Sequence, residues 1–304
     1  VYPASETVID TAAVGDHPVG LAVVTTTQKI YVANLHSWSV TPLWLADRER
    51  AAPDIYVGAQ ACRVVADPAE ARVYAANHLE TDNGVAAIDS QTDQRLYWYE
   101  RFNGTQGRYG IDVDPEANNL FVAARDAGLI AIQDADRPTA DPQIVKLDPA
   151  RVPFVVAFNP TTQHLFVTAP YDNKVVVLAP YSIEWTRAAR LWYEGQQVSL
   201  IDRTNAGWIK EVSVGLGAEE GIAVNPDTGL VYVTNASSNT VSVLQDAATP
   251  AQIRWLRDIA VGDVPQGIAV DVVRNRVYVG NAGSRDVTVI DGATHAVIAT
   301  IPLD

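Results

Sequence analysis

The sequence has 304 residues, of which 48% are hydrophobic and 19% charged, and its formal net charge at pH 7 is −14. The hydrophobic content excludes an intrinsically disordered chain, and the lack of an apolar run of about 18 residues excludes a membrane-spanning helix. The negative charge argues against nucleic acid and anionic membranes as partners, because both are polyanions.

The sulfur-containing residues favour an exported protein, and the first residues are compatible with export but also with trimming of another kind. The chain begins at Val1, and the residues that follow fit the region after a cleaved signal peptide. Cys62 is the sole cysteine and methionine is absent, so oxidation-prone side chains are scarce. A single cysteine also excludes an internal disulfide framework and a thiolate zinc site. We therefore expect a periplasmic or secreted location.

One sequence cassette recurs along the whole chain. Each copy contains a short run of β-branched residues around an aromatic residue, bounded by Gly, Asn, Asp or Pro, which predicts a strand between turns. The aromatic markers are Tyr31, Tyr74, Phe121, Phe166, Tyr232 and Tyr278. Their spacings are 43, 47, 45, 66 and 46 residues, which is the period of a repeat of about 45 residues with one insertion.

The strands of each copy are almost continuously apolar, as in sheets that are covered on both faces. Four such strands in about 45 residues are typical of a β-propeller blade. We predict an all-β fold, with one propeller domain over residues 1–304 and four-stranded antiparallel blades around a central channel. The length fits six blades, and a degenerate seventh blade is the alternative. Residues 6–14 and 296–303 both resemble an outer strand, and one of these segments is expected to close the ring.

One copy carries a family motif. Tyr232-Val233-Thr234-Asn235 resembles the repeat of the YVTN β-propeller family, and the likeness covers nearly the whole chain, most closely its last third. The resemblance implies the propeller fold. Proteins that it resembles include cell-surface proteins, subunits of periplasmic redox enzymes, and relatives of lactonases and streptogramin lyases. Because one fold hosts many functions, activity has to be argued from a site.

The longest interval contains an aromatic-rich insertion at residues 179–197. Tyr181, Trp185 and Trp192 have helical spacing, which fits a short amphipathic helix, and an aromatic hairpin fits equally well. Trp185 and Trp192 are candidate contacts for a protein partner. The alternative is a decoration that packs its tryptophans on the fourth blade.

Three of the five histidines are predicted to share one face of the propeller. The loops that lead into the innermost strands lie on the same face as the turns between second and third strands, and the repeat phase places His17, His36 and His78 there. With Glu80 they are candidate ligands of one divalent metal ion. The alternative is a set of solvated loop histidines. His164 and His295 are expected in turns at the opposite face.

The same face carries further polar and aromatic residues. The candidate catalytic residues are His17, His36, His78, Tyr109 and Glu220. The candidate ligand-binding residues are Arg63, Arg108, Arg125, Phe154, Tyr171, Gln266 and Arg285. Guanidinium groups bind carboxylates and phosphates through paired hydrogen bonds, so these residues predict a small polar or anionic ligand, with ion pairing to nearby carboxylates as the alternative.

Three functions are compatible with these residues. The absence of a strong catalytic motif favours an exported binding or scaffold propeller. A metal-assisted lyase or hydrolase of the lactonase type is the second hypothesis, and a propeller subunit of a periplasmic dehydrogenase is the third.

Overall fold

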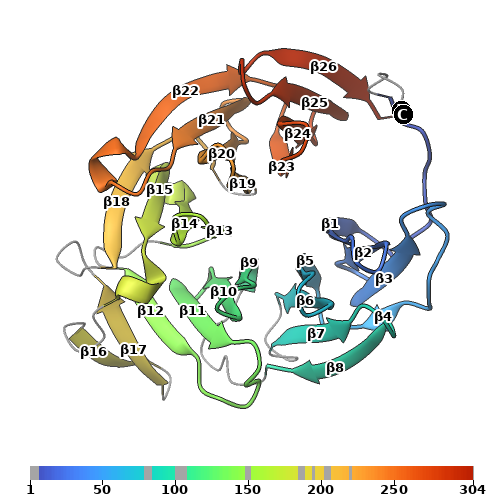
Figure 1. The fold of residues 1–304 in the computed structure, drawn as a ribbon, viewed down its shortest axis with the longest axis horizontal. Helices are drawn as coiled ribbons and strands as arrows, with labels where there is room; N and C mark the ends of the chain where they lie inside the picture. Colours follow the sequence, from blue (N-terminus) through green and yellow to red (C-terminus); the bar gives the residue numbers. More distant parts are fainter. Residues whose placement is uncertain are drawn as a thin grey trace. The chain divides into compact units, whose positions relative to one another are not determined.

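The computed structural model describes residues 7–78, 84–99, 108–147, 152–183, 189–193, 196–201, 207–218 and 221–303. The chain divides into two compact units. The first unit comprises residues 11–156 and 184–202, and the second comprises residues 1–10, 157–183 and 203–304. The fold class is the one predicted from the repeats, a six-bladed β-propeller in which each copy of the cassette forms one antiparallel four-stranded blade (Figure 1).

The first unit contains blades 1 to 3. Blade 1 consists of β1 (Pro18–Val24), β2 (Lys29–Asn34), β3 (Ser39–Trp44) and β4 (Ile55–Tyr56). Blade 2 consists of β5 (Ala61–Asp67), β6 (Arg72–Asn77), β7 (Val85–Asp89) and β8 (Gln94–Trp98). Blade 3 consists of β9 (Arg108–Asp114), β10 (Asn119–Ala124), β11 (Leu129–Asp134) and β12 (Gln143–Leu147).

The second unit contains blades 4 to 6. Blade 4 consists of β13 (Val156–Asn159), β14 (His164–Ala169), β15 (Lys174–Leu178) and β18 (Trp208–Ser213). Blade 5 consists of β19 (Ile222–Asn225), β20 (Leu230–Asn235), β21 (Thr240–Gln245) and β22 (Arg254–Ala260). Blade 6 consists of β23 (Pro265–Asp271), β24 (Arg276–Asn281), β25 (Asp286–Asp291) and β26 (Val297–Pro302).

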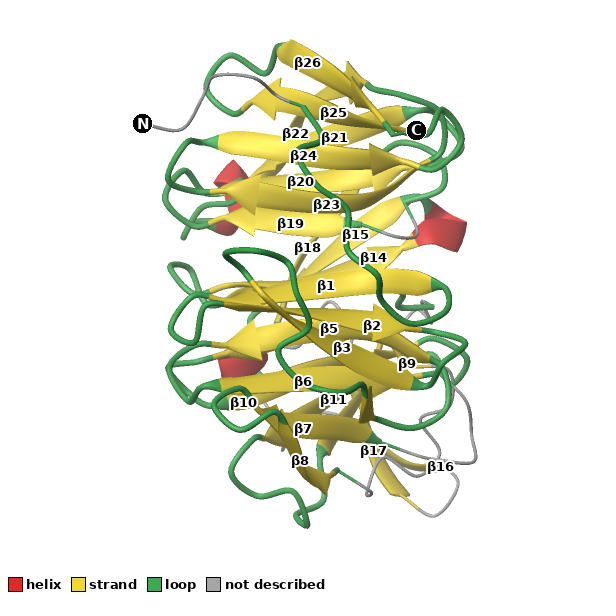
Figure 2. Cartoon of the chain, turned by 90° about the vertical axis from the view of Figure 1, so that its right-hand side faces the viewer, coloured by secondary structure: helices red, strands yellow, loops and turns green. Residues whose placement is uncertain are grey.

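Short 3-10 helices, red in Figure 2, lie in the connections: η1 (Pro170–Asp172), η2 (Pro180–Ser182) and η3 (Pro250–Gln252). Within the described residues, no helix has the length and apolar composition needed to cross a membrane.

The insertion forms a hairpin of β16 (Ala189–Tyr193) and β17 (Gln196–Ile201), so the helical alternative is wrong for these residues. The chain leaves blade 4 after β15, but β17 pairs in parallel with β12 and extends the sheet of blade 3. The hairpin is therefore not a decoration of blade 4. Trp192 lies in β16, whereas Trp185 lies outside the described residues.

The two terminal segments that resemble an outer strand differ in structure. The trailing segment forms β26, the outer strand of blade 6, as its sequence predicts. Residues 7–14 form no strand. Of the two segments that resemble an outer strand, the trailing one is therefore the outer strand of the last blade, whose four strands all come from the C-terminal part of the chain.

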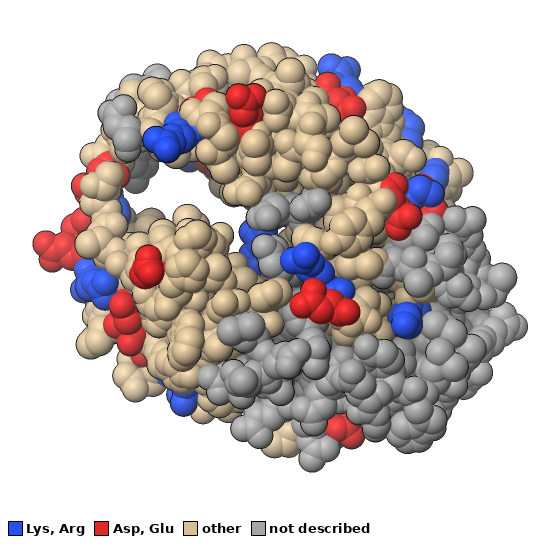
Figure 3. Space-filling view, turned by 180° about the vertical axis from the view of Figure 1, so that it is seen from behind, with Lys and Arg blue, Asp and Glu red and all other residues tan. Residues whose placement is uncertain are grey.

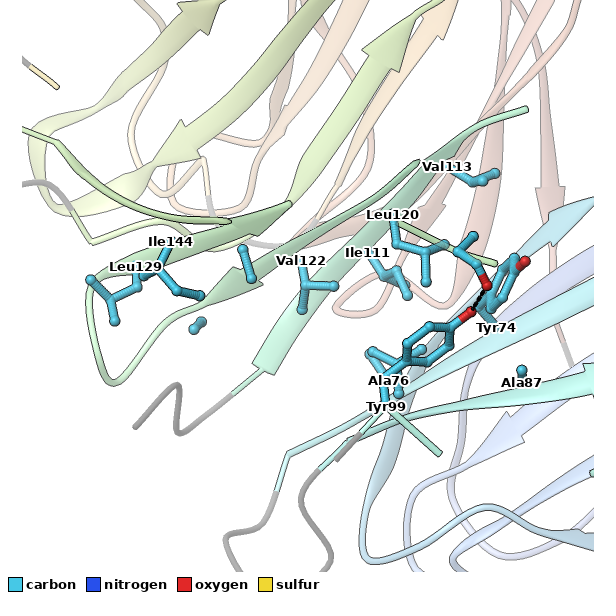
Figure 4. Packing of buried hydrophobic residues seen from close by; sticks show 14 of the residues in the cluster. Tyr74, Ala76, Ala87, Tyr99, Ile111, Val113, Leu120, Val122, Leu129 and Ile144 are labelled. Carbon is cyan, nitrogen blue, oxygen red and sulfur yellow. Dashed lines mark hydrogen bonds between the residues drawn. The ribbon is translucent and has the colours of Figure 1, made fainter. Parts of the chain in front are cut away.

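The core lies between neighbouring blades and explains the continuous apolar runs. Five of the six aromatic markers are completely buried, and they are Tyr31, Tyr74, Phe121, Phe166 and Tyr232. Figure 4 shows Tyr74 and Tyr99 from the blade 2 segment packed against Ile111 and Leu120 of blade 3. The Tyr99 hydroxyl donates a hydrogen bond of 2.6 Å to the carbonyl oxygen of Ala135. Both faces of a blade therefore lose water on folding, which favours apolar residues at successive positions.

The asparagine that ends the motif has a structural role. The Asn235 side-chain amide donates to Thr240 Oγ1 at 3.0 Å and to Ser242 Oγ at 2.9 Å, which fixes the turn between β20 and β21. A Cβ atom at Gly215 would lie 2.7 Å from Cγ of Asn235. Position 215 must therefore be glycine for the loop before β19 to lie this close to the asparagine side chain. Blades 1 and 6 repeat this arrangement with Gly15 against Asn34 and with Gly262 against Asn281.

Two residues after each of these glycines, the backbone is left-handed. The φ angles are 56° at His17, 74° at Gly217 and 53° at Val264. Gly217 adopts this conformation without strain, but a β-branched residue such as Val264 is disfavoured there by about 1–2 kcal/mol. The repeat therefore places a strained residue in blade 6 where blade 5 has glycine.

We expect Val264→Gly to raise the free energy of unfolding by about 0.5–1 kcal/mol, because relief of strain exceeds the added entropy of the unfolded chain. The matched control is Gly217→Ala, whose Cβ would lie 2.5 Å from Ser237 Oγ and which should therefore be destabilising. Denaturant unfolding of the three proteins measures both effects. A loss of stability in Val264→Gly would contradict the argument.

Candidate functional site

The top end of a blade is defined here as the end where the chain enters its first strand and where its second and third strands are joined. In blade 1, the backbone N–H of Leu35 donates to the carbonyl of His17 at 2.9 Å, and that of His36 donates to the carbonyl of Asp16 at 3.2 Å. These hydrogen bonds tie the two top loops of the blade together. The same pair of bonds recurs in blade 5 (Ala236 to Gly217, Ser237 to Leu216) and in blade 6 (Ala282 to Val264, Gly283 to Asp263).

This backbone frame brings two of the predicted histidines together. The rings of His17 and His36 are stacked, with centroids 4.5 Å apart and an angle of 27° between their planes. Both side chains are exposed, and His36 Nδ1 lies 3.6 Å from Asp16 Oδ2. At the corresponding positions, blade 5 has Gly217 and Ser237 and blade 6 has Val264 and Gly283.

The stacked geometry does not suit a metal site. Zinc requires imidazole nitrogens about 2.0–2.1 Å from the ion with their in-plane lone pairs converging on it, whereas near-parallel stacked rings direct their lone pairs side by side. His78 follows β6 and is half-buried, while Glu80 and Glu220 lie outside the described residues. In the part of the chain that the structure describes, no group of three or more His, Cys, Asp or Glu residues is arranged to hold a metal ion.

A second predicted pair also comes together in the first unit. The Arg125 guanidinium lies over the Phe154 ring, with its carbon 4.4 Å from the ring centroid, and Phe154 is buried. Arg125 Nε is 3.7 Å from Asp126 Oδ1. A guanidinium has the donor geometry that binds carboxylates and phosphates, and the nearby Asp126 carboxylate fits the ion-pairing alternative.

The remaining predicted residues are distributed over both units. In the first unit, Arg63 is half-buried in β5, and Arg108 and Tyr109 lie in β9, where their side chains are outside the description. In the second unit, Tyr171 is exposed in η1 and Arg285 is exposed in the turn before β25. Gln266 is half-buried in β23, and its carbonyl accepts a hydrogen bond of 3.1 Å from Thr234 Oγ1.

Contacts between charged or basic side chains and aspartates join neighbouring blades at the opposite end, where the sequence analysis named no site, and two of them are buried. Three residues that open a second strand each pair with an aspartate of the following blade. The pairs are Lys29 with Asp93 at 2.6 Å, Arg72 with Asp136 at 3.1 Å and His164 with Asp246 at 2.7 Å. A basic residue (Lys, Arg or His) two residues before the aromatic marker was the sequence signal that could have revealed them.

The His164–Asp246 pair resembles part of a catalytic triad, because a buried carboxylate orients an imidazole. The third member of the group argues against that function. The Thr162 hydroxyl donates to Asp246 Oδ2 at 2.5 Å rather than to the imidazole, and Asn159 Nδ2 donates to the same oxygen at 2.7 Å. The carboxylate is thus the centre of the group, and its three donors join blade 4 to blade 5.

The surface offers two further observations. On the face drawn in Figure 3, the described basic and acidic side chains lie in small mixed groups rather than in one continuous basic patch. An open groove of about 380 Å³ runs along Trp208–Glu211 of β18. Its charged side chains are engaged, since Lys210 donates to the Ile253 carbonyl at 2.6 Å and Glu211 pairs with Lys174 at 2.9 Å.

No family model matches the chain, and no curated protein matches it in sequence. Among solved structures, the chain is similar to Kuenenia stuttgartiensis hydrazine synthase, with a TM-score of 0.64 and 15% sequence identity. The match covers 90% of this chain and 83% of that chain. At this identity the similarity shows the fold alone. The resemblance to the YVTN family remains a prediction.

Proposed function

We propose that this chain is an exported binding propeller whose top-end residues in blades 1 to 3 hold a small polar or anionic ligand. The observation that carries the proposal is the blade 1 pair of exposed, stacked imidazoles at His17 and His36. Blades 5 and 6 keep the same backbone frame but each have a glycine in the pair. A constant frame with a distinct, exposed side-chain pair in one blade is the arrangement expected of recognition rather than of folding.

The chemistry of the first unit supports an anionic or strongly polar ligand. Imidazole N–H groups and a stacked guanidinium donate hydrogen bonds to carboxylate and phosphate oxygens. In the first unit, His17 and His36 supply the imidazole donors, and Arg125 supplies the guanidinium. The chain has a net charge of −14, so most of its surface repels anions. An anionic ligand is therefore expected to bind at these donor groups rather than elsewhere.

The lactonase-like alternative is less well supported. It requires His17, His36 and His78 to converge on a metal ion, and the stacked rings of the first two do not converge. The dehydrogenase-subunit hypothesis has no observation that favours it over a binding function.

The proposal is tested by thermal unfolding with citrate, inorganic phosphate or Zn²⁺ as probes. We expect citrate or phosphate to raise the unfolding midpoint of the wild type by several degrees at saturation, since an excess of about 100-fold over Kd adds about 2.7 kcal/mol. The double variant His17→Asn/His36→Asn should lose this shift, and His295→Asn, at the opposite end of blade 6, should keep it. Asparagine tolerates the left-handed backbone at position 17.

Two outcomes would contradict the proposal. One is the absence of any shift with either anion. The other is an equal shift in all three proteins, which would place binding elsewhere. Stoichiometric Zn²⁺ binding that disappears in the double variant would replace the proposed function with the metal-dependent alternative.

A further inference from the structure

The hairpin that extends blade 3 ends in a strand with an unpaired edge. The order of this sheet is β16-β17-β12-β11-β10-β9, so in the described part of the chain β16 pairs only with β17 (Figure 1). An unpaired edge presents a row of backbone donors and acceptors to which another strand can add. Natural proteins protect such edges with bulges, prolines, charges or short strands.

The other outer strands of the propeller are protected in these ways. β8, β18, β22 and β26 each pair with their neighbour through a register shift, and β4 has only two residues. β12 pairs with β11 without a register shift, and its outer side is covered by β17. β16 pairs with β17 in continuous register over five residues. Among the described outer strands longer than two residues, β16 is thus the one that has neither a register shift nor a neighbour on its outer side.

The sequence of β16 is complementary to itself. Ala189-Arg190-Leu191-Trp192-Tyr193 contains no proline and one charged residue. If two copies pair antiparallel about Leu191, then Arg190 stands opposite Trp192, and Ala189 stands opposite Tyr193. Arginine and tryptophan attract one another as a cation and an aromatic ring, a small residue opposite a large one fills a cross-strand pair, and no two like charges meet.

We propose that two copies of this chain associate through β16, which pairs antiparallel with its counterpart around a two-fold axis at Leu191. The two blade 3 sheets then form one continuous sheet, and the contact is isologous. The charge of the hairpin supports a second copy as the occupant. β16 and β17 contain one charged residue, Arg190, and the sequence that joins them contains Glu194, so the hairpin carries no formal net charge, whereas the whole chain carries −14. The hairpin is therefore a segment at which two acidic molecules can approach.

Sedimentation equilibrium of the full chain tests the proposal. Two five-residue strands bury less surface than a standard stable protein–protein interface. We therefore expect a weak monomer–dimer equilibrium with Kd on the order of 10 µM. Higher salt should strengthen association, because screening reduces repulsion between the acidic chains. Leu191→Lys and Leu191→Glu should each be monomeric, since each places like charges opposite one another on the axis. An equimolar mixture of the two variants should dimerise again.

The controls separate loss of pairing from loss of folding. Leu96→Lys alters an exposed residue on the shifted edge β8 and should leave the wild-type equilibrium unchanged. Trp192→Arg should abolish association, because the introduced guanidinium then faces Arg190 of the second copy, and the double variant Arg190→Glu/Trp192→Arg should restore it. A wild type that stays monomeric at about 200 µM, or a dimer that Leu191→Lys does not weaken, would overturn the proposal. Failure of the mixture to dimerise would refute the two-fold register at Leu191.

Discussion

Asp246→Ala is expected to lower the free energy of unfolding by about 3–5 kcal/mol, the usual cost of removing one partner from a buried ionic group. Asp246 is buried, and its carboxylate accepts hydrogen bonds from His164, Asn159 and Thr162. Alanine would leave the buried donors of His164 and Asn159, and the half-buried Thr162 hydroxyl, without their acceptor. Because the donors belong to blade 4 and the acceptor to blade 5, the contact between these two blades should loosen.

Denaturant unfolding measures this decrease in the free energy of unfolding, and two further variants serve as comparisons. Asp246→Asn keeps one acceptor oxygen in place and should lose less stability than alanine. Asp227→Ala removes an exposed carboxylate in the same blade and should change stability by less than about 0.5 kcal/mol. A loss below about 1 kcal/mol for Asp246→Ala would mean that the group contributes no more than an exposed ion pair.

Periodicity predicted the fold because the repeat is local. Each blade is formed from one stretch of chain, with the outer strand of blade 4 alone displaced by the insertion. Tyr31, Tyr74 and Tyr232 mark the same strand in three blades and are all buried. The pattern of apolar residues therefore encoded both the strands and their burial.

The ionic contacts between blades escaped sequence analysis because their partners belong to different repeats. His164 and Asp246 are separated by 82 residues, and Lys29 and Asp93 by 64. The basic residue recurs two positions before the aromatic marker, but the sequence does not show which aspartate of the following repeat it meets. The repeat phase nevertheless predicted that His17 and His36 share one end of blade 1, because both positions are fixed within a single blade. Glu80 and Glu220, the two carboxylates predicted to belong to the same site, lie outside the described residues.

The insertion shows the limit of pattern analysis most clearly. Helical spacing of Tyr181, Trp185 and Trp192 was compatible with a helix, but the residues from Ala189 onward form a hairpin whose second strand pairs in parallel with blade 3. Aromatic residues fit both structures. The available edge of β12 decides between them, and that edge exists only once the neighbouring blade has formed.

Lys29→Met is expected to destabilise the protein by about 3–5 kcal/mol, because it leaves the Asp93 carboxylate buried without its cation. Lys29 is 3% exposed and Asp93 is 7% exposed. Lys29 Nζ donates to Asp93 Oδ2 at 2.6 Å and to the Ser90 carbonyl at 3.0 Å, and the Tyr31 hydroxyl donates to Asp93 Oδ1 at 2.6 Å. Burial, together with this hydrogen bond, raises the pKa of Tyr31 well above its usual value, so the hydroxyl remains a donor.

The double variant Lys29→Met/Asp93→Asn should recover much of the stability that Lys29→Met alone removes, since it leaves no unpaired buried charge. Asparagine also tolerates the left-handed backbone at position 93, where φ is 57°. Tyr31 keeps an acceptor in this variant, because its hydroxyl also lies 3.2 Å from the Ser90 carbonyl. Denaturant unfolding of the four proteins gives the coupling energy between positions 29 and 93. A matched cycle on the exposed pair Arg274–Asp271, whose atoms are 2.7 Å apart, should give less than about 1 kcal/mol. If the two cycles gave equal coupling, burial would not be what makes the contact between blades 1 and 2 strong, and the common position of these pairs in the repeat would need a different explanation.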